Sequence, residues 1–196
     1  MNLQFLGDAL DHWKGSVFEQ LQQAKQLLDF RVDAMASDSD KWTSVDWSLF
    51  TSLLRVTPVQ IVKHKATLSK TRDDYFAEVP QNGDLFLDPD TGIMTGSAKD
   101  LRQYLKPCEL IRLLEADQSR MLGVYQHVRA QRTRDRVEQV LAAVRAVRKV
   151  FYCASYESGT VAMLFFSLDK SRVASLERYY RAFLGKHADR RIGIWA

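Results

Sequence analysis

Two aspartates directly after a short apolar run suit metal-assisted chemistry on a phosphate group. Asp88 and Asp90 follow the run at 85–87 and are separated by one proline. In an extended segment, residues two apart point to the same face, so both carboxylates can reach one ligand. Paired carboxylates suit a hard cation such as Mg²⁺ or Mn²⁺, which keeps several waters for a phosphate substrate. We therefore expect Asp88 and Asp90 to bind a metal, with Asp88 also acting in catalysis. The alternative is a tight hydrogen-bonded turn.

A second polar group ends the apolar run at 119–128. His127 can act as a general acid or base near neutral pH, and we expect it to be catalytic. Tyr125 lies two positions earlier and shares its face in extended geometry. Arg129 can hold a phosphate with two parallel hydrogen bonds. We expect Tyr125 and Arg129 to bind substrate. For His127, the alternative to a catalytic role is a structural one.

Three further residues are expected to face the same crevice. Lys14 lies in the predicted helix 7–25, three residues after an aspartate. Its expected role is catalytic, by neutralising phosphate, and the alternative is an ordinary solvent-exposed lysine. Asp33 and Asp38 follow the first predicted strand, and we expect both to bind substrate beside Asp88.

The elements that must position these residues alternate between helix and strand. Apolar residues recurring every three or four positions predict helices, and β-rich runs bounded by turn residues predict strands. The predicted helices are 7–25, 47–56, 57–79, 107–117, 133–150 and 169–187, and the predicted strands are 27–35, 84–88, 119–128, 151–158 and 160–168, with a short one at 191–196. This order predicts one α/β domain over 1–196, a three-layer sheet that ends in an antiparallel hairpin at Ser158-Gly159. Ligands of such sheets bind outside the carboxyl ends of the strands.

Several short motifs carry a resemblance. The opening FLGDALDHWKGSVFEQL resembles the start of the large-subunit ribosomal RNA adenine-N6 methyltransferase family, whose Gly-x-x-x-Asp-x-x-Lys segment is matched by Gly7, Asp11 and Lys14. The family's Asp-Pro-Pro-Tyr motif is echoed by Asp88-Pro89-Asp90-Thr91. The resemblance implies a Rossmann-like, methyltransferase-like sheet closed by a hairpin. Leu-Asp-Pro-Asp-x-Gly together with Tyr-Gln-His also resembles a group of uncharacterised bacterial and phage proteins.

Differences from this family shape the functional hypothesis. No glycine occurs in 33–38, where the family needs a glycine-rich turn against its cofactor, and Asp90-Thr91 replaces Pro-Tyr. We therefore expect a divalent metal and not S-adenosylmethionine. The leading hypothesis is a metal-dependent enzyme with nuclease-like phosphodiester hydrolysis of a nucleic acid or nucleotide. The alternatives are a methyltransferase with an atypical cofactor pocket, and a degenerate module of phage or defence-linked type that binds nucleic acid or protein.

Composition and charge narrow the range of partners and compartments that we expect for this protein. The net charge is +4 and the pI about 9.1, with arginines and lysines concentrated in 129–149 and 178–191. These stretches are either solvated helix faces or a surface for nucleic acid. The apolar run 161–166 is too short to cross a membrane, and the start has no signal-peptide pattern. The isolated Cys108 and Cys153 predict reduced thiols in a cytoplasmic protein. Neither a phosphate-binding Gly-x-x-x-x-Gly-Lys loop nor a Gly-x-Ser-x-Gly elbow is found.

Overall fold

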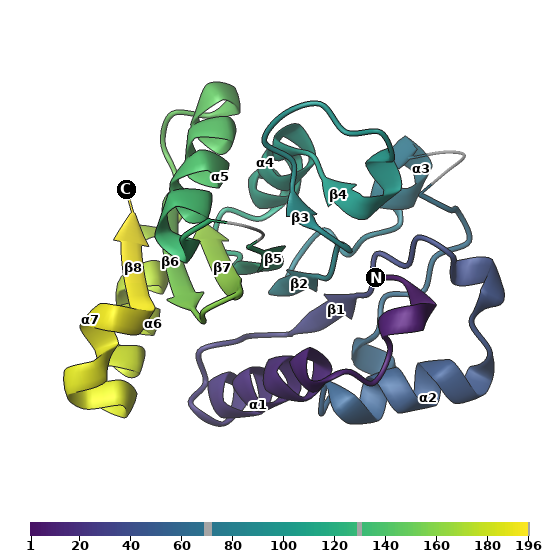
Figure 1. The fold of residues 1–196 in the computed structure, drawn as a ribbon, viewed down its shortest axis with the longest axis horizontal. Coiled ribbons are helices and arrows are strands. Elements are labelled where there is room, and N and C mark those ends of the chain that lie inside the picture. Colours follow the sequence, from purple (N-terminus) through teal and green to yellow (C-terminus); the bar gives the residue numbers. More distant parts are fainter. Residues whose placement is uncertain (69–71, 129–130, 196) are drawn as a thin grey trace.

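A mixed sheet forms the centre of the computed structural model, which describes residues 1–68, 72–128 and 131–195. Within these residues, six strands pair in the order β1-β2-β5-β7-β6-β8 (Figure 1). The first three in this order run parallel, and the last three pair antiparallel to their neighbours. The strands are β1 (Arg31–Asp33), β2 (Leu85–Leu87), β5 (Leu122–His127), β7 (Val161–Ser167), β6 (Tyr152–Glu157) and β8 (Ile192–Trp195).

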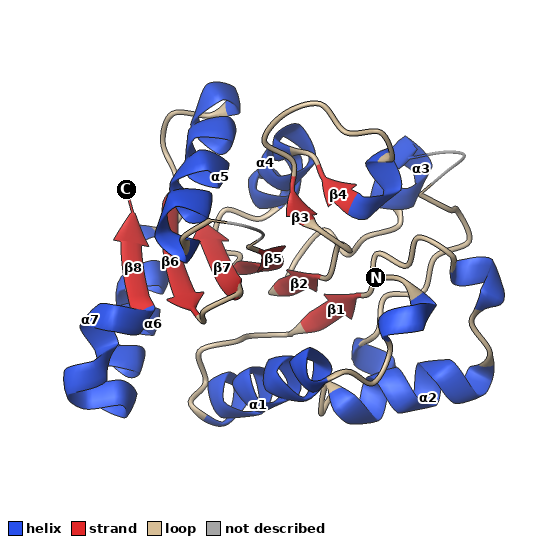
Figure 2. Ribbon diagram, in the orientation of Figure 1, coloured by secondary structure: helices blue, strands red, loops and turns tan. Residues whose placement is uncertain are grey.

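Helices cover both faces of this sheet and bury their apolar stripes against it (Figure 2). One core cluster joins one face to apolar residues of α1, α2 and α6, and a second joins the other face to α3, α4 and α5. The helices are α1 (Ala9–Gln23), α2 (Ser44–Leu53), α3 (Arg72–Ala77), α4 (Pro107–Ala116), α5 (Thr133–Val147), α6 (Lys170–Leu184) and α7 (Ala188–Arg191). The predicted α/β class with three layers is therefore confirmed.

The carboxyl-terminal part follows the expected hairpin. The backbone N–H of Ser158 donates to the carbonyl of Val161 at 2.8 Å and closes the turn between β6 and β7. β7 enters the sheet between β5 and β6, so the hairpin is continuous with the parallel strands. The last predicted strand is present as β8, which pairs with β6.

The predicted helix 57–79 is wrong. Among the described residues, a 3₁₀ turn covers Pro58–Gln60, irregular chain follows as far as residue 68, and α3 covers Arg72–Ala77. In that turn the Gln60 side-chain oxygen accepts from the Thr57 N–H at 2.8 Å, and Val62 then donates its N–H to the carbonyl of Val32 at 2.8 Å. This bond to the edge of β1 draws the chain into an extended form. A small parallel pair, β3 (Gly92–Ile93) with β4 (Tyr104–Leu105), was not predicted either.

Helices α1 and α2 cross at Gly15. A Cβ placed on this glycine would lie 2.1 Å from the backbone oxygen of Leu53, so the two helices would have to move apart. We expect Gly15→Ala to lower the free energy of unfolding in urea by about 1–3 kcal/mol, although alanine favours an isolated helix by about 1 kcal/mol. Gly96→Ala is the matched control, because no atom of the described residues lies within 4 Å of its Cβ position. Equal stability of the two variants would contradict this crossing.

Candidate functional site

Lys14 of α1 reaches the carboxyl end of β2. Its ammonium group donates to the carboxylates of Asp88 at 2.8 Å and Asp11 at 3.0 Å. The backbone N–H of Gly7 donates to the other oxygen of Asp11 at 2.9 Å, so the three residues of the Gly-x-x-x-Asp-x-x-Lys motif connect to Asp88. The side chains of Lys14, Asp11 and Asp88 are 5%, 1% and 2% exposed. The alternative that Lys14 is a solvent-exposed lysine is therefore wrong.

Burial and charge work against each other in this cluster. Burial alone lowers the pKa of Lys14, but the Asp88 and Asp11 carboxylates outweigh it and raise that pKa above its usual value. Burial raises the pKa of Asp11, against the lowering effect of Lys14. The ring of Tyr125 lies 4.4 Å from the Lys14 ammonium, and burial raises the pKa of its phenol. Lys14 is thus a fixed cation between two carboxylates, over a neutral aromatic ring.

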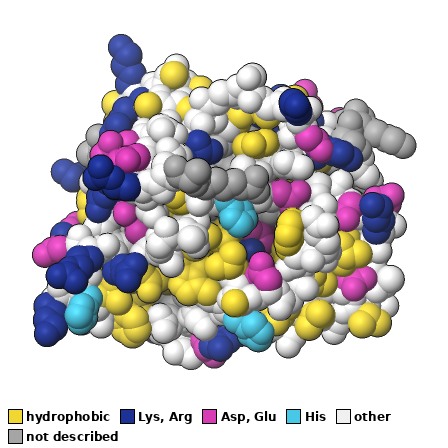
Figure 3. Space-filling model, viewed as in Figure 1, with side chains coloured by type: hydrophobic (Ala, Val, Ile, Leu, Met, Phe, Trp, Pro, Cys, Tyr) yellow, Lys and Arg dark blue, Asp and Glu magenta, His cyan; other side chains and the backbone are white. Residues whose placement is uncertain are grey.

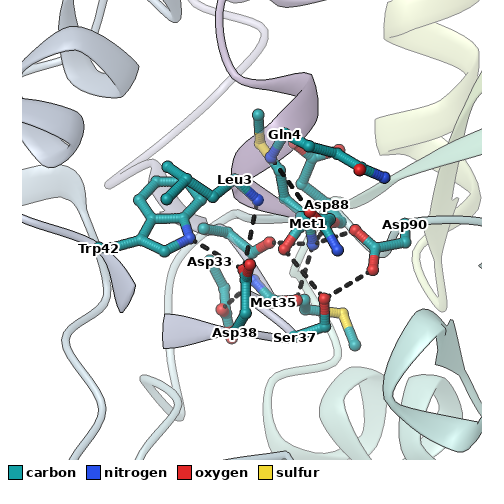
Figure 4. Close-up of polar contacts among 12 residues, drawn as sticks. Met1, Leu3, Gln4, Asp33, Met35, Ser37, Asp38, Trp42, Asp88 and Asp90 are labelled. Atoms are coloured by element: carbon teal, nitrogen blue, oxygen red, sulfur yellow. Dashed lines mark hydrogen bonds and ion pairs between the residues drawn. The ribbon is translucent and has the colours of Figure 1, made fainter. Parts of the chain in front are cut away.

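Asp90 contacts a different cation, the amino group of Met1 (Figure 4). This amino group donates to the backbone oxygens of Ala34 at 2.9 Å, Met35 at 2.7 Å and Asp88 at 2.8 Å, and lies 3.1 Å from the Asp90 carboxylate. The two aspartates predicted to bind one metal therefore pair with two separate ammonium groups. Among the described residues, no group of three or more histidine, cysteine or acidic side chains is arranged to hold a metal. Magnesium binding at Asp88 and Asp90 stays a prediction.

Gln126 holds the loop that follows β2. Its side-chain oxygen accepts from the N–H of Ile93 at 2.8 Å, and its amide donates to the carbonyl of Thr91 at 3.1 Å. Gly92 turns there with a φ of 120°, and a Cβ on it would lie within 2.5 Å of the Gln126 side chain. The Asp-Pro-Asp-x-Gly and Tyr-Gln-His segments are therefore parts of one hydrogen-bonded unit, which the sequence did not reveal.

The end of β5 places Tyr125 and His127 on one face, as the alternation of a strand predicts. Their ring centroids lie 4.8 Å apart at an interplanar angle of 88°. The backbone N–H of His127 donates to the carbonyl of Thr91 at 3.1 Å, which ties this end to the Asp88 loop. Arg129 lies outside the described residues. The roles assigned to His127, Tyr125 and Arg129 stay predictions.

Asp33 ends β1 among residues that the sequence did not connect to it. Its carboxylate accepts from the Tyr75 hydroxyl at 2.5 Å and from the Met35 N–H at 2.8 Å, and its other oxygen lies 3.0 Å from His64. The His64 ring stacks on Tyr75 with centroids 3.6 Å apart. His64 falls within the predicted helix 57–79, but the structure places it in the irregular chain before α3, and its side chain is 9% exposed.

Asp38 serves the segment at the start of the chain. Its carboxylate accepts from the N–H of Leu3 at 3.3 Å and from the indole of Trp42 at 3.2 Å (Figure 4). The structure therefore places Asp38 beside the segment that carries Met1, and its substrate-binding role stays a prediction.

A cavity of about 830 Å³ opens at the carboxyl end of β1. It is lined by the loop after that strand, by α2 and by the irregular chain before α3; Asp33, Ala36, Trp47, Ser52 and His64 are among its walls. This volume lies in the range of small-molecule sites, about 300–1,000 Å³. The loop turns at Met35 with a φ of 43°, a left-handed conformation that is uncommon for any residue but glycine. The chain thus makes a tight turn here without the glycines that the methyltransferase family has at this position.

Basic side chains gather on the part of the surface formed by α5 and the carboxyl-terminal helices (Figure 3). Several of them face acidic partners: Arg134 lies 3.5 Å from Glu157, and Arg181 lies 2.7 Å from Asp189. Nucleic-acid binding at this surface stays a prediction. Separately, none of the described helices combines the length and apolar character needed to cross a membrane.

Comparison with known proteins yields little similarity. No family model and no curated protein matches the chain. Among solved structures, a match is found to the crystal structure of a Legionella pneumophila protein of the family DUF519, with a TM-score of 0.42 and 11% identity. The match covers 78% of this chain and 57% of that protein, so the chain spans little more than half its length.

Proposed function

We propose that this protein binds a nucleoside that carries an amino-acid group, of the S-adenosylmethionine type, at an atypical methyltransferase-like site. One observation carries the proposal: the loop after β1 lines the 830 Å³ cavity on one side and holds an α-ammonium group with its backbone oxygens on the other. Ala34 belongs to both parts, because it lines the cavity and accepts from the Met1 amino group. A ligand with both chemical parts suits this pair of adjoining sites.

The cavity has the chemistry that a nucleoside needs. The indole of Trp47 and the imidazole of His64 offer ring faces for a base, and the hydroxyls of Ser48, Thr51 and Ser52 offer partners for a ribose. The absence of glycine in 33–38 was the argument against such a cofactor. The left-handed turn at Met35 weakens that argument, because the backbone carbonyls of the loop are presented to an ammonium group without glycine.

The neighbouring cluster of Lys14, Asp11 and Asp88 would contact the reacting end of such a ligand. When bound, a cofactor of this class supplies an electrophilic methyl group. The chain's own contribution is Lys14, which fixes the Asp88 carboxylate at the strand end, and Asp11, which keeps Lys14 in place. The Tyr125 hydroxyl is buried and has no hydrogen-bond partner among the described residues. Buried polar atoms are normally paired, so this hydroxyl is a candidate contact for an acceptor molecule.

Hydrolysis of a phosphodiester through a metal remains the competing hypothesis. It requires a cation at Asp88 and Asp90, where Lys14 and the Met1 amino group now lie within 3.1 Å. Titration of the protein with MgCl₂ in a calorimeter separates the two hypotheses. Heat of binding that disappears in Asp90→Asn would favour the metal, and binding of S-adenosylhomocysteine without added metal would favour the proposal.

Filling the cavity gives a direct test. Ser52 lines it from the exposed side of α2, so Ser52→Trp should occupy the space without disturbing the core. We expect the affinity for S-adenosylhomocysteine to fall by about 100-fold or more, which corresponds to roughly 2.7 kcal/mol. Leu49→Trp is the matched control, because Leu49 is 45% exposed on the same helix and is not among the lining residues.

Calorimetry on the two tryptophan variants tests whether the ligand binds in the cavity. Loss of binding in Ser52→Trp alone, with equal melting temperatures, supports a ligand in the cavity. Equal affinity in both variants, or no binding by the unmodified protein, would sink the proposal.

A further inference from the structure

We infer that His64 is a pH-dependent latch on one wall of the 830 Å³ cavity. When protonated, its ring joins the carboxylates of Asp33 and Glu78 and fixes this wall, whereas the neutral ring bonds to Asp33 alone. The wall is the chain at 62–68, which we call the wall segment; its lining residues are Val62, Lys63, His64, Lys65 and Thr67. The inference goes beyond the proposed function, because it does not depend on which ligand the cavity takes.

The His64 ring lies between two hydrogen-bond acceptors. Its Nε2 lies 3.0 Å from an Asp33 oxygen, and its Nδ1 lies 3.6 Å from a Glu78 oxygen. The side chain is 9% exposed, and Nδ1 is buried with no hydrogen-bond partner among the described residues. A carboxylate can only accept, so the short contact to Asp33 assigns the proton of the neutral ring to Nε2. Nδ1 then presents a bare lone pair to Glu78, which contributes no bond.

Protonation of the ring turns this contact between two acceptors into an ion pair. A proton on Nδ1 makes that atom a donor to Glu78 and gives the ring a charge between two carboxylates, although burial of the ring opposes the charge. The backbone N–H of Lys65 donates to the Glu78 carboxylate at 2.6 Å and lowers its pKa. Glu78 is therefore an anion across pH 5–8, the range in which histidines usually change charge.

The other titratable and charged groups around the ring do not replace these two carboxylates. The Tyr75 ring of α3 stacks on His64 with centroids 3.6 Å apart, and burial raises the pKa of its phenol, which stays neutral. Arg72 of α3 pairs with Glu109. The remaining charged side chains of the cavity lining are exposed and screened by water; these are Asp40, Lys63 and Lys65.

Glu78 also holds the middle of the wall segment. Val62 and Leu68 anchor the two ends of the segment in the core cluster on the α3 side of the sheet. Between them the chain is irregular, and the backbone N–H groups of Lys65 and Ala66 donate to the Glu78 carboxylate at 2.6 and 3.4 Å. The protonated latch ties this carboxylate to β1 and so makes local opening of the wall rarer. The contact contributes at low pH and is lost as pH rises and the imidazole loses its proton.

Hydrogen exchange of the ligand-free protein at pH 5 and pH 8 tests the latch. The amides of Lys65 and Ala66 report on the wall segment, because both donate to Glu78. The Glu78 side chain is 31% exposed, so its pair with the ring is one of moderate strength. We expect the protection factors of these amides, corrected for the effect of pH on intrinsic exchange, to be about three- to five-fold higher at pH 5 than at pH 8.

Two variants separate the latch from other effects of pH. Glu78→Gln keeps an oxygen acceptor for the Lys65 N–H and removes the charge that the latch engages, so we expect equal protection factors at the two pH values. His12→Gln is the matched control, because His12 is exposed on α1 and is not among the lining residues. We expect it to keep the full effect of pH.

Three results would overturn the latch. They are equal protection of the two amides at both pH values in the unmodified protein, an undiminished effect of pH in Glu78→Gln, and nitrogen NMR that finds the proton of the neutral His64 ring on Nδ1. Binding of S-adenosylhomocysteine, which calorimetry measures separately, bears on none of these results. The latch and the proposed function can therefore fail independently.

Discussion

Lys14→Met is expected to lower the free energy of unfolding at pH 7 by about 3–5 kcal/mol, the usual effect of removing one partner from a buried ion pair. Methionine keeps most of the side-chain volume, so the loss reports charge and not a cavity. Without the ammonium, Asp11 and Asp88 stay buried at 1% and 2% side-chain exposure with no cation between them. Urea denaturation followed by circular dichroism measures the change.

The loss should depend on pH in a defined direction. Burial already raises the pKa of Asp11, and Lys14 opposes this, so removing Lys14 raises that pKa further. A carboxyl whose pKa is raised in the folded state destabilises it more as pH rises through that pKa. The deficit of Lys14→Met should therefore be smaller at pH 4 than at pH 7. A deficit that is the same at both pH values would mean that charge is not its cause.

Glu19→Ala on the same helix is the matched control. Glu19 pairs with Arg55, and both side chains are 44% exposed, so the pair lies in water. Exposed pairs contribute about 0–1 kcal/mol, and we expect a change within that range and little dependence on pH between 5 and 8. A comparable loss in both variants would show that α1 tolerates no substitution and would remove the argument about burial.

Local patterns in the sequence accounted for most of the elements. Val17, Phe18 and Leu21 recur at helical spacing and form the buried stripe of α1. Ser158-Gly159 marks the turn between β6 and β7, and the two runs beside it are the strands. Such signals lie within a few residues of one another, so a single sequence suffices to find them. The segment 57–79 failed because a bond between Val62 and Val32, which are distant in sequence, decides its conformation.

The site was harder to predict from the sequence, because it too depends on contacts between residues that are distant in sequence. The position of Asp88 after a strand indicated the correct edge of the sheet, but its partner Lys14 lies 74 residues away. The role of Ser37 depends on Met1 and Asp90, and that of His64 on Asp33 and Tyr75. No spacing rule relates these residues. Gln126 was also missed, although a local signal pointed to it: it stands between Tyr125 and His127, two residues predicted to lie in the site.

Asp33→Ala is expected to lower the free energy of unfolding by about 3 kcal/mol or more, the second large effect. Each buried donor that is left without a partner costs roughly 1–3 kcal/mol. The Asp33 carboxylate accepts from the buried Tyr75 hydroxyl and from the Met35 N–H, and both donors would lose their partner. Burial, and then the charge of Asp33, raises the pKa of Tyr75, so its hydroxyl stays a donor. Asp33 also lines the cavity, so affinity for S-adenosylhomocysteine should fall with stability.

A double-mutant cycle separates the Tyr75 contact from the rest. Tyr75→Phe removes the hydroxyl and keeps the ring that stacks on His64. If the hydroxyl and Asp33 depend on each other, Tyr75→Phe should destabilise the Asp33→Ala protein less than the unmodified protein, with a coupling of about 1–2 kcal/mol. Asp74→Ala, at an exposed position beside Tyr75 in α3, should show no coupling. Strict additivity of Asp33→Ala and Tyr75→Phe would mean that the carboxylate acts through Met35 and His64 alone. The Tyr75 hydroxyl of α3 would then not stabilise the turn after β1 through Asp33.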